Sequence, residues 1–246
     1  MGHVTVVGGC RAKAPSTGIV ASSLAVGTTV KLMEGGTAVE YLVVNQGIPG
    51  NSSLYDASCD GTWLLRKDCL SDRAWNSGNV NDYENSTINT WLNGDFFNSL
   101  GAIEQSAIKQ VKIPYRAGSG YSKTVKSGAN GLSTKVFLLG GYEIGITTAV
   151  NAGFPEDGAR LAYFDDGATT TALNKRIANY NGKAAYWWLR SAYCASAGGS
   201  TVAWRINSSG SNEGISVNVN QYIRPGLVLP SEALFDASTL ILKGAV

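Results

Sequence analysis

The C-terminal part of the chain holds a stretch of small residues between two strings of large apolar and basic ones. The first string, Trp-Trp-Leu-Arg-Ser, occupies positions 187–191, and the second, Tyr-Ile-Arg-Pro-Gly-Leu-Val-Leu-Pro, occupies 222–230. Between them, residues 192–221 are mostly Ala, Ser, Gly, Asn and Thr. Within 214–223 apolar and polar residues alternate, which is the period of a strand with one buried face. The pattern predicts a fixed inner face and an exchangeable outer face, as in a binding surface on a rigid scaffold.

This alternation assigns a direction to each side chain of the segment. The inward set is predicted to be buried and consists of Ile206, Ile215, Val217, Val219 and Ile223. The outward set is predicted to be exposed on one surface and includes Ser216, Asn218 and Asn220.

Composition excludes several classes of partner. The 246 residues are 44% hydrophobic and only 15% charged, with a net charge of +2. So small a charge gives no field that would gather nucleic acid or anionic lipid, so neither is expected as a partner. The chain has no run of about eighteen apolar residues, so no membrane insertion is expected. Its first residues lack the pattern of a secretory signal peptide, as is also true of virion proteins released by lysis.

Local patterns predict short strands, two early helices and long loops. A hairpin is expected at 29–44, with Gly35-Gly36 in its turn, and further strands at 61–65 and 135–139. Ser86 begins a helix within 82–100 that Asn93-Gly94 stops, and a second helix spans 102–110 with Ile103 facing inward. These elements favour an α+β fold, with one domain over 23–246 after an N-terminal arm or linker at 1–22.

Candidate chemistry is sparse. The only histidine, His3, lies near the first residue, which disfavours Ser–His, Cys–His and multi-histidine metal sites. We expect no metal site and no cofactor. The four cysteines have no metal-type spacing and are interpreted as buried free thiols, with a Cys59–Cys69 disulfide as the alternative. The loop Asp165-Asp166-Gly167 is interpreted as a turn, with a calcium site as the alternative.

The large residues around the segment also have two interpretations each. Trp188 and Trp204 are expected in the core, although tryptophans also form exposed binding platforms. Arg190 and Arg224 are expected to hold carboxylates or loop carbonyls, and the alternative is an anionic ligand.

Several motifs together resemble a known family. They are Gly-Thr-Trp-Leu-Leu at 61–65, Trp-Asn at 75–76, Ser-Thr-Ile-Asn-Thr-Trp-Leu-Asn at 86–93, Lys-Val-Phe-Leu-Leu at 135–139, the string at 187–191 and Ile-Arg-Pro at 223–225. In these motifs the chain resembles DUF6273, a family of uncharacterised domains common in gut Firmicutes and their phages. The resemblance covers roughly residues 24–235.

The C-terminal motifs also resemble the C-type-lectin-type fold of formylglycine-generating enzymes and of variable proteins of diversity-generating retroelements. Receptor-binding phage proteins of the major tropism determinant type belong to that second group. The resemblance implies a C-type-lectin-type fold with a twisted antiparallel sheet and long structured loops. It implies mutable residues displayed on a constant backbone. The calcium-binding strings of sugar-binding lectins are absent, so calcium-dependent sugar recognition is not expected.

The sequence therefore predicts a non-enzymatic ligand-binding or display domain, in a phage tail or on a bacterial cell surface. Its partner would be a host cell-surface protein or glycan, with other virion tail proteins as further partners. The alternatives are a glycan- or cell-wall-degrading enzyme, or a structural virion or adhesin module. The outward residues of 192–221 are the candidate ligand contacts: Tyr193, Ser196, Ser200, Ala203, Arg205, Asn207, Ser209, Asn212, Glu213, Ser216, Asn218, Asn220 and Gln221.

Overall fold

The predicted hairpin forms one edge of a five-stranded sheet. The computed structural model describes residues 18–147, 153–195 and 199–245. Strands β2 (Thr29–Glu34) and β3 (Thr37–Gln46) pair antiparallel, and Gly35 and Gly36 take the positive φ angles that their tight turn requires. This first sheet has the order β10-β17-β4-β3-β2. Its other members are β4 (Thr62–Arg66), β10 (Val136–Phe137) and β17 (Gly226–Leu229).

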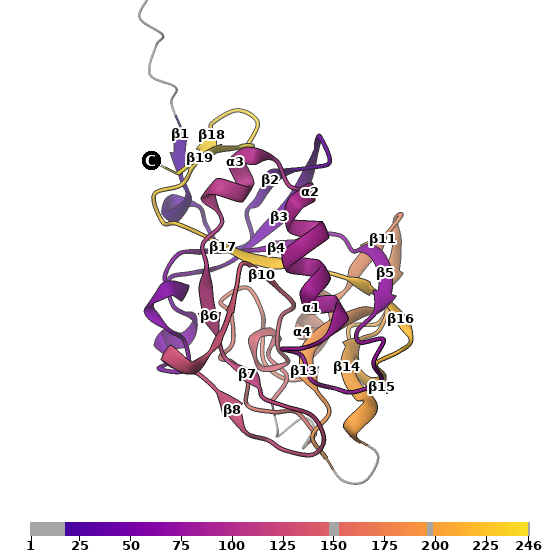
Figure 1. Cartoon of the computed structure of the whole chain (residues 1–246). Helices are drawn as coiled ribbons and strands as arrows, with labels where there is room; N and C mark the ends of the chain where they lie inside the picture. The colour runs from indigo at the N-terminus through magenta and orange to yellow at the C-terminus, as the bar shows by residue number, and fades with distance from the viewer. Residues whose placement is uncertain (1–17, 148–152, 196–198, 246) are drawn as a thin grey trace, which may run out of the picture.

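A second five-stranded sheet carries the C-terminal segment and has the order β15-β14-β13-β16-β5. Its strands are β5 (Leu70–Ala74), β13 (Trp187–Ala192), β14 (Val202–Ile206), β15 (Asn212–Ser216) and β16 (Asn220–Ile223). Strands β13 and β16 run parallel, while every other neighbouring pair is antiparallel. Figure 1 shows the first sheet in the upper half of the molecule and the second at the lower right.

Smaller sheets complete the described part of the chain. One is three-stranded, with β1 (Gly18–Val20), β18 (Leu234–Asp236) and β19 (Leu242–Gly244). Three two-stranded sheets pair β6 (Val111–Ile113) with β9 (Leu132–Thr134), β7 (Tyr115–Arg116) with β8 (Val125–Lys126), and β11 (Ala178–Tyr180) with β12 (Lys183–Ala185). Strand β1 thus joins the last strands of the fold to residues within the expected N-terminal arm.

The expectation of an α+β, C-type-lectin-type fold is corrected. The structure is mostly β, with 36% strand and 20% helix distributed among several sheets. The helices remain short, because α1 (Thr87–Trp91), α3 (Ala102–Ala107) and α4 (Thr170–Arg176) each have seven residues or fewer. None of the helices that the structure describes is long and apolar enough to cross a membrane.

The two early helices differ in detail from the prediction. Ser86 caps α1 as expected, accepting a hydrogen bond from the Asn89 amide at 3.2 Å. However, Asn93-Gly94 does not stop the helix, which continues through a π-helical turn, η4 (Leu92–Phe96), into α2 (Phe97–Ser99). In α3 the side chain of Ile103 faces solvent and is 45% exposed, so its predicted inward position is wrong.

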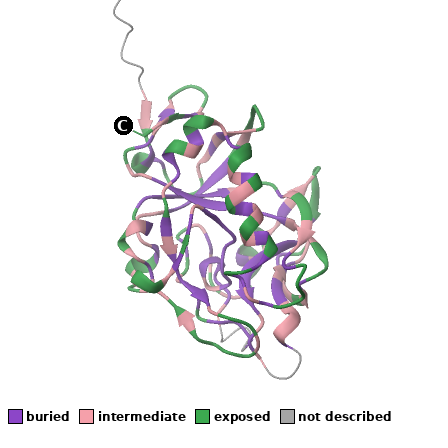
Figure 2. Ribbon diagram, viewed as in Figure 1, coloured by how far each residue is buried: buried purple, intermediate pink, exposed green. Residues whose placement is uncertain are grey.

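A single apolar core joins the two large sheets (Figure 2). Trp188 and Trp204 belong to it, which confirms their predicted place in the core, and Trp187 is buried as well. The indole N–H of Trp188 donates to the carbonyl of Arg73 at 3.0 Å, so each large ring also has a polar partner.

The strand predicted across 214–223 is in fact two strands. Strand β15 ends at Ser216 and β16 begins at Asn220, because the intervening turn is closed by the Val219 amide donating to Ser216 at 3.2 Å. Ile206, Val217 and Ile223 are buried as predicted, but Ile215 is only half-buried and Val219 is 40% exposed. Asn218 and Asn220 are exposed as predicted, whereas Ser216 is half-buried. The alternation therefore describes two strands with different partners.

Candidate functional site

Arg205 is the centre of a cluster of polar side chains on β14, β15 and β16. The register places Glu213 directly opposite Arg205, and their side chains form an ion pair at 2.8 Å. A second guanidinium nitrogen donates to Oε1 of Gln221 at 2.8 Å. The guanidinium also lies over the ring of Tyr186, 4.4 Å from its centroid. We call Tyr186, Arg205, Asn207, Glu213 and Gln221 the Arg205 cluster.

Asn207 joins the cluster to the turn between β14 and β15. Its amide nitrogen donates to Oε1 of Glu213 at 2.6 Å, and its Oδ1 accepts from the amides of Ser209 and Ser211. Hydrogen bonds from Asn207 and Arg205 lower the pKa of Glu213. The cluster is therefore held in one arrangement by its own contacts, although the Arg205 and Glu213 side chains are 17% and 39% exposed.

A hollow of about 580 Å³ adjoins the Arg205 cluster. It lies beside the hairpin of β11 and β12, whose turn places Asn181 and Gly182 at positive φ. The rings of Tyr180 and Tyr222 are stacked with centroids 4.4 Å apart. We call this site the tyrosine hollow, and its lining consists of Tyr180, Asn181, Lys183, Ala184, Ala185, Tyr186 and Tyr222. Tyr186 lines the hollow and also carries the Arg205 guanidinium.

Four of the predicted contacts meet in the Arg205 cluster: Arg205, Asn207, Glu213 and Gln221. Ser209 lies beside it, where its hydroxyl donates to Oδ1 of Asn207 at 2.7 Å. Prediction from the sequence missed the three tyrosines of the hollow. The Asn181-Gly182 turn with a tyrosine on either side was the available signal for two of them.

The other predicted contacts lie apart from this cluster. Asn212 and Ser216 are half-buried at the two ends of β15, and Asn218 and Asn220 are exposed around the next turn. The half-buried Tyr193 ring packs against Trp204, and Ser200 is half-buried with its carbonyl bound to the Asn81 amide. Ala203 is fully buried, so it does not reach the predicted outer face. Ser196 lies outside the described residues.

A second polar group lies in the core. Arg190 and Glu143 form a bidentate ion pair with contacts of 2.8 and 3.2 Å, and both side chains are fully buried. The same guanidinium donates to the carbonyls of Leu138 and Asp157. The Ser191 hydroxyl donates to the Asp157 carboxylate at 2.9 Å. The network therefore fixes the chain around 138–143 and at 157 to strand β13.

Burial determines the titration of this group. Desolvation raises the pKa of Asp157 to about 6, although the charge of Arg190 opposes the shift. The structural interpretation of both arginines is confirmed, since buried Arg224 donates to the carbonyl of Arg66 at 2.8 Å and lies over Trp187.

The remaining candidates for chemistry are structural in the described residues. Cys59, Cys69 and Cys194 are buried free thiols, as predicted, and desolvation raises their pKa values to about 12, 11 and 11. Asp165 pairs with Lys175 in the loop before α4. Within the described ranges no group of three or more His, Cys, Asp or Glu side chains is placed to hold a metal ion.

Comparison with known proteins gives one match. The model of a family described as a domain of unknown function, DUF6273, matches residues 60–231, which are 172 of the 246 residues. The matched region contains the Arg205 cluster, the tyrosine hollow and the buried Arg190 network. Searches of curated proteins and of solved structures found no match.

Proposed function

This chain belongs to the DUF6273 family, and because that domain is of unknown function, we propose a role from its own side chains. We propose that it is a non-enzymatic ligand-binding domain whose contact surface is the Arg205 cluster together with the tyrosine hollow. Its ligand is a protein or glycan on the surface of a host cell. A phage tail or a retroelement-diversified surface protein would use such a domain for attachment, and other tail proteins are further partners.

One observation carries this proposal: a partly exposed arginine is held in place beside a hollow lined by three tyrosines. Arginine and tyrosine are enriched among the residues that dominate binding energy at interfaces. Because Glu213, Gln221 and Tyr186 already fix the Arg205 side chain, a ligand would not have to order it. Tyrosine supplies an apolar ring face and a polar hydroxyl, which suit both sugar rings and protein side chains.

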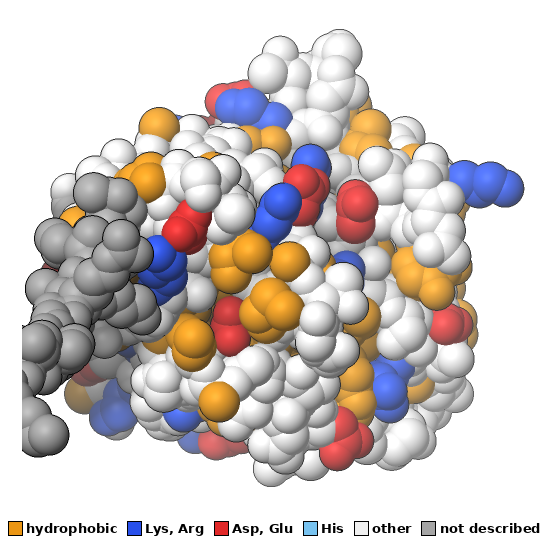
Figure 3. All heavy atoms as spheres, turned by 90° about the horizontal axis from the view of Figure 1, so that it is seen from above, with side chains coloured by type: hydrophobic (Ala, Val, Ile, Leu, Met, Phe, Trp, Pro, Cys, Tyr) orange, Lys and Arg blue, Asp and Glu red, His pale blue; other side chains and the backbone are white. Residues whose placement is uncertain are grey.

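The arrangement of carboxylates favours a binder over a glycan-degrading enzyme. Glycoside hydrolysis commonly uses two carboxylates about 5–10 Å apart in a cleft that admits the substrate. Glu143 and Asp157 both contact Arg190, but both are fully buried in the core. Lys109, Lys112 and the other exposed cations are distributed over several elements, and the face seen from above in Figure 3 carries both signs of charge interspersed. This distribution favours specific contacts over general electrostatic attraction.

Binding to intact bacterial cells and to arrays of bacterial glycans tests the proposal. Fluorescently labelled protein is measured by flow cytometry on cells and by fluorescence on the arrays. We expect Arg205→Ala and Tyr222→Ala each to weaken binding at least about tenfold, since truncated hot-spot residues lose about 2 kcal/mol or more. The control is Lys67→Ala, which removes an exposed ion pair with Glu40 on the other large sheet.

Two outcomes contradict the proposal. Binding that Arg205→Ala, Tyr222→Ala and Lys67→Ala leave equally strong would place the contact surface elsewhere. Absence of binding to cells and arrays, with the wild-type protein folded, would favour the structural virion or adhesin module.

A further inference from the structure

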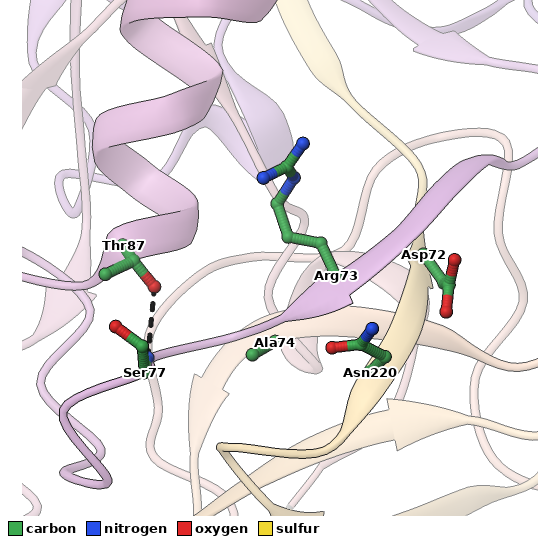
Figure 4. A pocket seen from close by; sticks show the side chains of 6 residues that line it. All are labelled: Asp72, Arg73, Ala74, Ser77, Thr87 and Asn220. Carbon is green, nitrogen blue, oxygen red and sulfur yellow. Dashed lines mark hydrogen bonds between the residues drawn. The ribbon is translucent and has the colours of Figure 1, made fainter.

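A second hollow lies on the other side of Gln221 from the Arg205 cluster. It has a volume of about 390 Å³ and is formed between β5, the start of α1 and the first residue of β16. We call it the Arg73 hollow, and its lining consists of Asp72, Arg73, Ala74, Ser77, Thr87 and Asn220. Figure 4 shows Arg73 projecting from β5 beside α1, with Ser77 and Thr87 toward one end and Asn220 and Asp72 toward the other.

The guanidinium of Arg73 has unused hydrogen-bonding capacity. It lies over the ring of Trp91, with its central carbon 4.1 Å from the ring centroid. Among the residues that the structure describes, no carboxylate lies within ion-pair distance of Arg73, and its buried Nε has no hydrogen-bond partner. A buried charged donor without a partner is costly, because charged hydrogen bonds typically contribute about 1.5–3 kcal/mol.

The neighbouring Asp72 does not neutralise this charge. In the pairing with β16, Asp72 lies opposite Tyr222 and Arg73 lies opposite Gln221. Successive side chains of a strand point to opposite faces, so the carboxylate of Asp72 is directed away from the guanidinium. Asp72 is exposed, where water screens its charge.

The other lining groups include hydroxyl donors. Oγ1 of Thr87 accepts a hydrogen bond from the Ser77 amide at 3.1 Å, which leaves the Thr87 hydroxyl proton available (Figure 4). Ser77 adds a second hydroxyl and Asn220 a side-chain amide. An arginine fork with neutral donors beside it suits the geometry of a carboxylate or a phosphate.

We propose that the Arg73 hollow binds an anionic group, a carboxylate or a phosphate, on the ligand that the tyrosine hollow recognises. This deepens the proposed function, on which it rests, by giving the ligand a negative charge. The two sites are close, because Gln221 lies opposite Arg73 in the strand register and accepts a hydrogen bond from Arg205. An acidic sugar unit or a sugar phosphate would supply the group.

Titration of the whole chain with small anions tests the proposal without a cell-surface ligand. The Nε–Hε signal of Arg73 is followed by NMR during addition of glucuronate, glycerol phosphate or neutral glucose at constant ionic strength. We expect a saturable shift with at least one anion and none with glucose. A stronger response to glucuronate would identify a carboxylate as the preferred group, and a stronger response to glycerol phosphate a phosphate.

Variants separate specific binding from general attraction. Arg73→Gln should weaken anion binding at least about tenfold, as expected for loss of charged hydrogen bonds, measured on the remaining shifted signals around the hollow. Asn220→Asp places a carboxylate in the hollow at an exposed position and should weaken it similarly. Asp72→Asn should strengthen it, and Lys67→Gln on the first sheet is the control that should leave it unchanged.

The thermal midpoint of each variant is measured first. If Arg73→Gln fails to fold, Asn220→Asp provides the test, because its side chain is not part of the core. Shifts that do not saturate, or that Asn220→Asp and Lys67→Gln change equally, would overturn the proposal. Loss of cell binding in Arg205→Ala together with no anion binding would retain the proposed function and reject this inference alone.

Discussion

Arg190 places a full charge where water does not reach. The residue is 1% exposed, and its contacts with Glu143 and two backbone carbonyls compensate for the lost hydration. A buried ion pair contributes little relative to an apolar replacement of both partners, but removal of one partner leaves an unpaired charge in the core. The fold around β13 therefore depends on each member of the network being present.

Glu143→Ala should lower the free energy of unfolding by about 3–5 kcal/mol, because it leaves the Arg190 charge buried without its carboxylate. Urea denaturation measures this loss. The matched control is Glu40→Ala, whose partner Lys67 is 43% exposed at the side chain, and for such a surface pair we expect a loss below about 1 kcal/mol. Equal losses in the two variants would show that the buried pair is not the constraint we infer.

Asp157 should make stability depend on pH. Its folded-state pKa of about 6 is above the ordinary value of 3.8, so between these values the unfolded chain releases a proton that the folded chain keeps. This group therefore lowers the free energy of unfolding as pH rises from about 4 to 6, by up to about 3 kcal/mol. Asp157→Asn keeps an oxygen acceptor for Ser191 but does not titrate. Denaturation of wild type and variant at several pH values should show the difference growing over this window, and parallel curves would contradict the assignment.

At the scale of elements, local sequence patterns were most reliable where a hairpin or a cap depends on nearby residues. The Gly35-Gly36 turn and the Ser86 cap required only local geometry. The turn between Ser216 and Asn220 contains no Gly or Pro, and it forms because β15 and β16 pair with different distant strands. The π-helical continuation past Asn93 also depends on tertiary contacts, since its side chain binds Thr134 and the backbone of β10.

The candidate site shows the same division. Arg205 and Glu213 belong to one hairpin, so sequence alternation placed both on the outer face. The tyrosine hollow combines Tyr180 with Tyr222, which are brought together by the parallel pairing of β13 and β16. The Arg73 hollow likewise requires β5 to pair with β16. Neither pairing has a signal in the local residue pattern.

The turn from β14 to β15 should be less tolerant of change than the turn from β15 to β16. Asn207→Ala removes an acceptor for two backbone amides and should lower the free energy of unfolding by about 1–2 kcal/mol. Asn218→Ala changes an exposed side chain and should stay within about 0.5 kcal/mol. Thermal denaturation of the two variants compares the turns. A neutral Asn207→Ala would restore the sequence-based hypothesis that both asparagines are freely exchangeable.

At the scale of the whole molecule, the family match is smaller than the folded unit. The match begins at residue 60, but β4 pairs with β3, and β3 pairs with β2. The two N-terminal strands contribute Val30, Leu32, Val43 and Val44 to the core, all fully buried. The family region therefore lacks one side of its own first sheet.

A protein truncated to residues 60–231 should not form the native core, whereas residues 18–246 should. Loss of β2 and β3 leaves β4 with an unpaired edge and exposes the apolar side chains that they cover. Near-ultraviolet circular dichroism of the tryptophans and NMR signal dispersion compare the two proteins. Native-like spectra from 60–231 would show that the hairpin is an accessory to the domain.

The pairing of β4 with β17 also has a consequence for folding during synthesis. Arg66 at the end of β4 accepts a hydrogen bond from Arg224, 158 residues later in the chain. At roughly 5–20 residues per second, a ribosome needs about 10–30 s to make the intervening chain. During that interval the hairpin and β4 exist with an apolar edge that has no partner, and even the complete chain must close a very long loop. Nascent copies on one polysome therefore display this edge to one another before their own β17 is made.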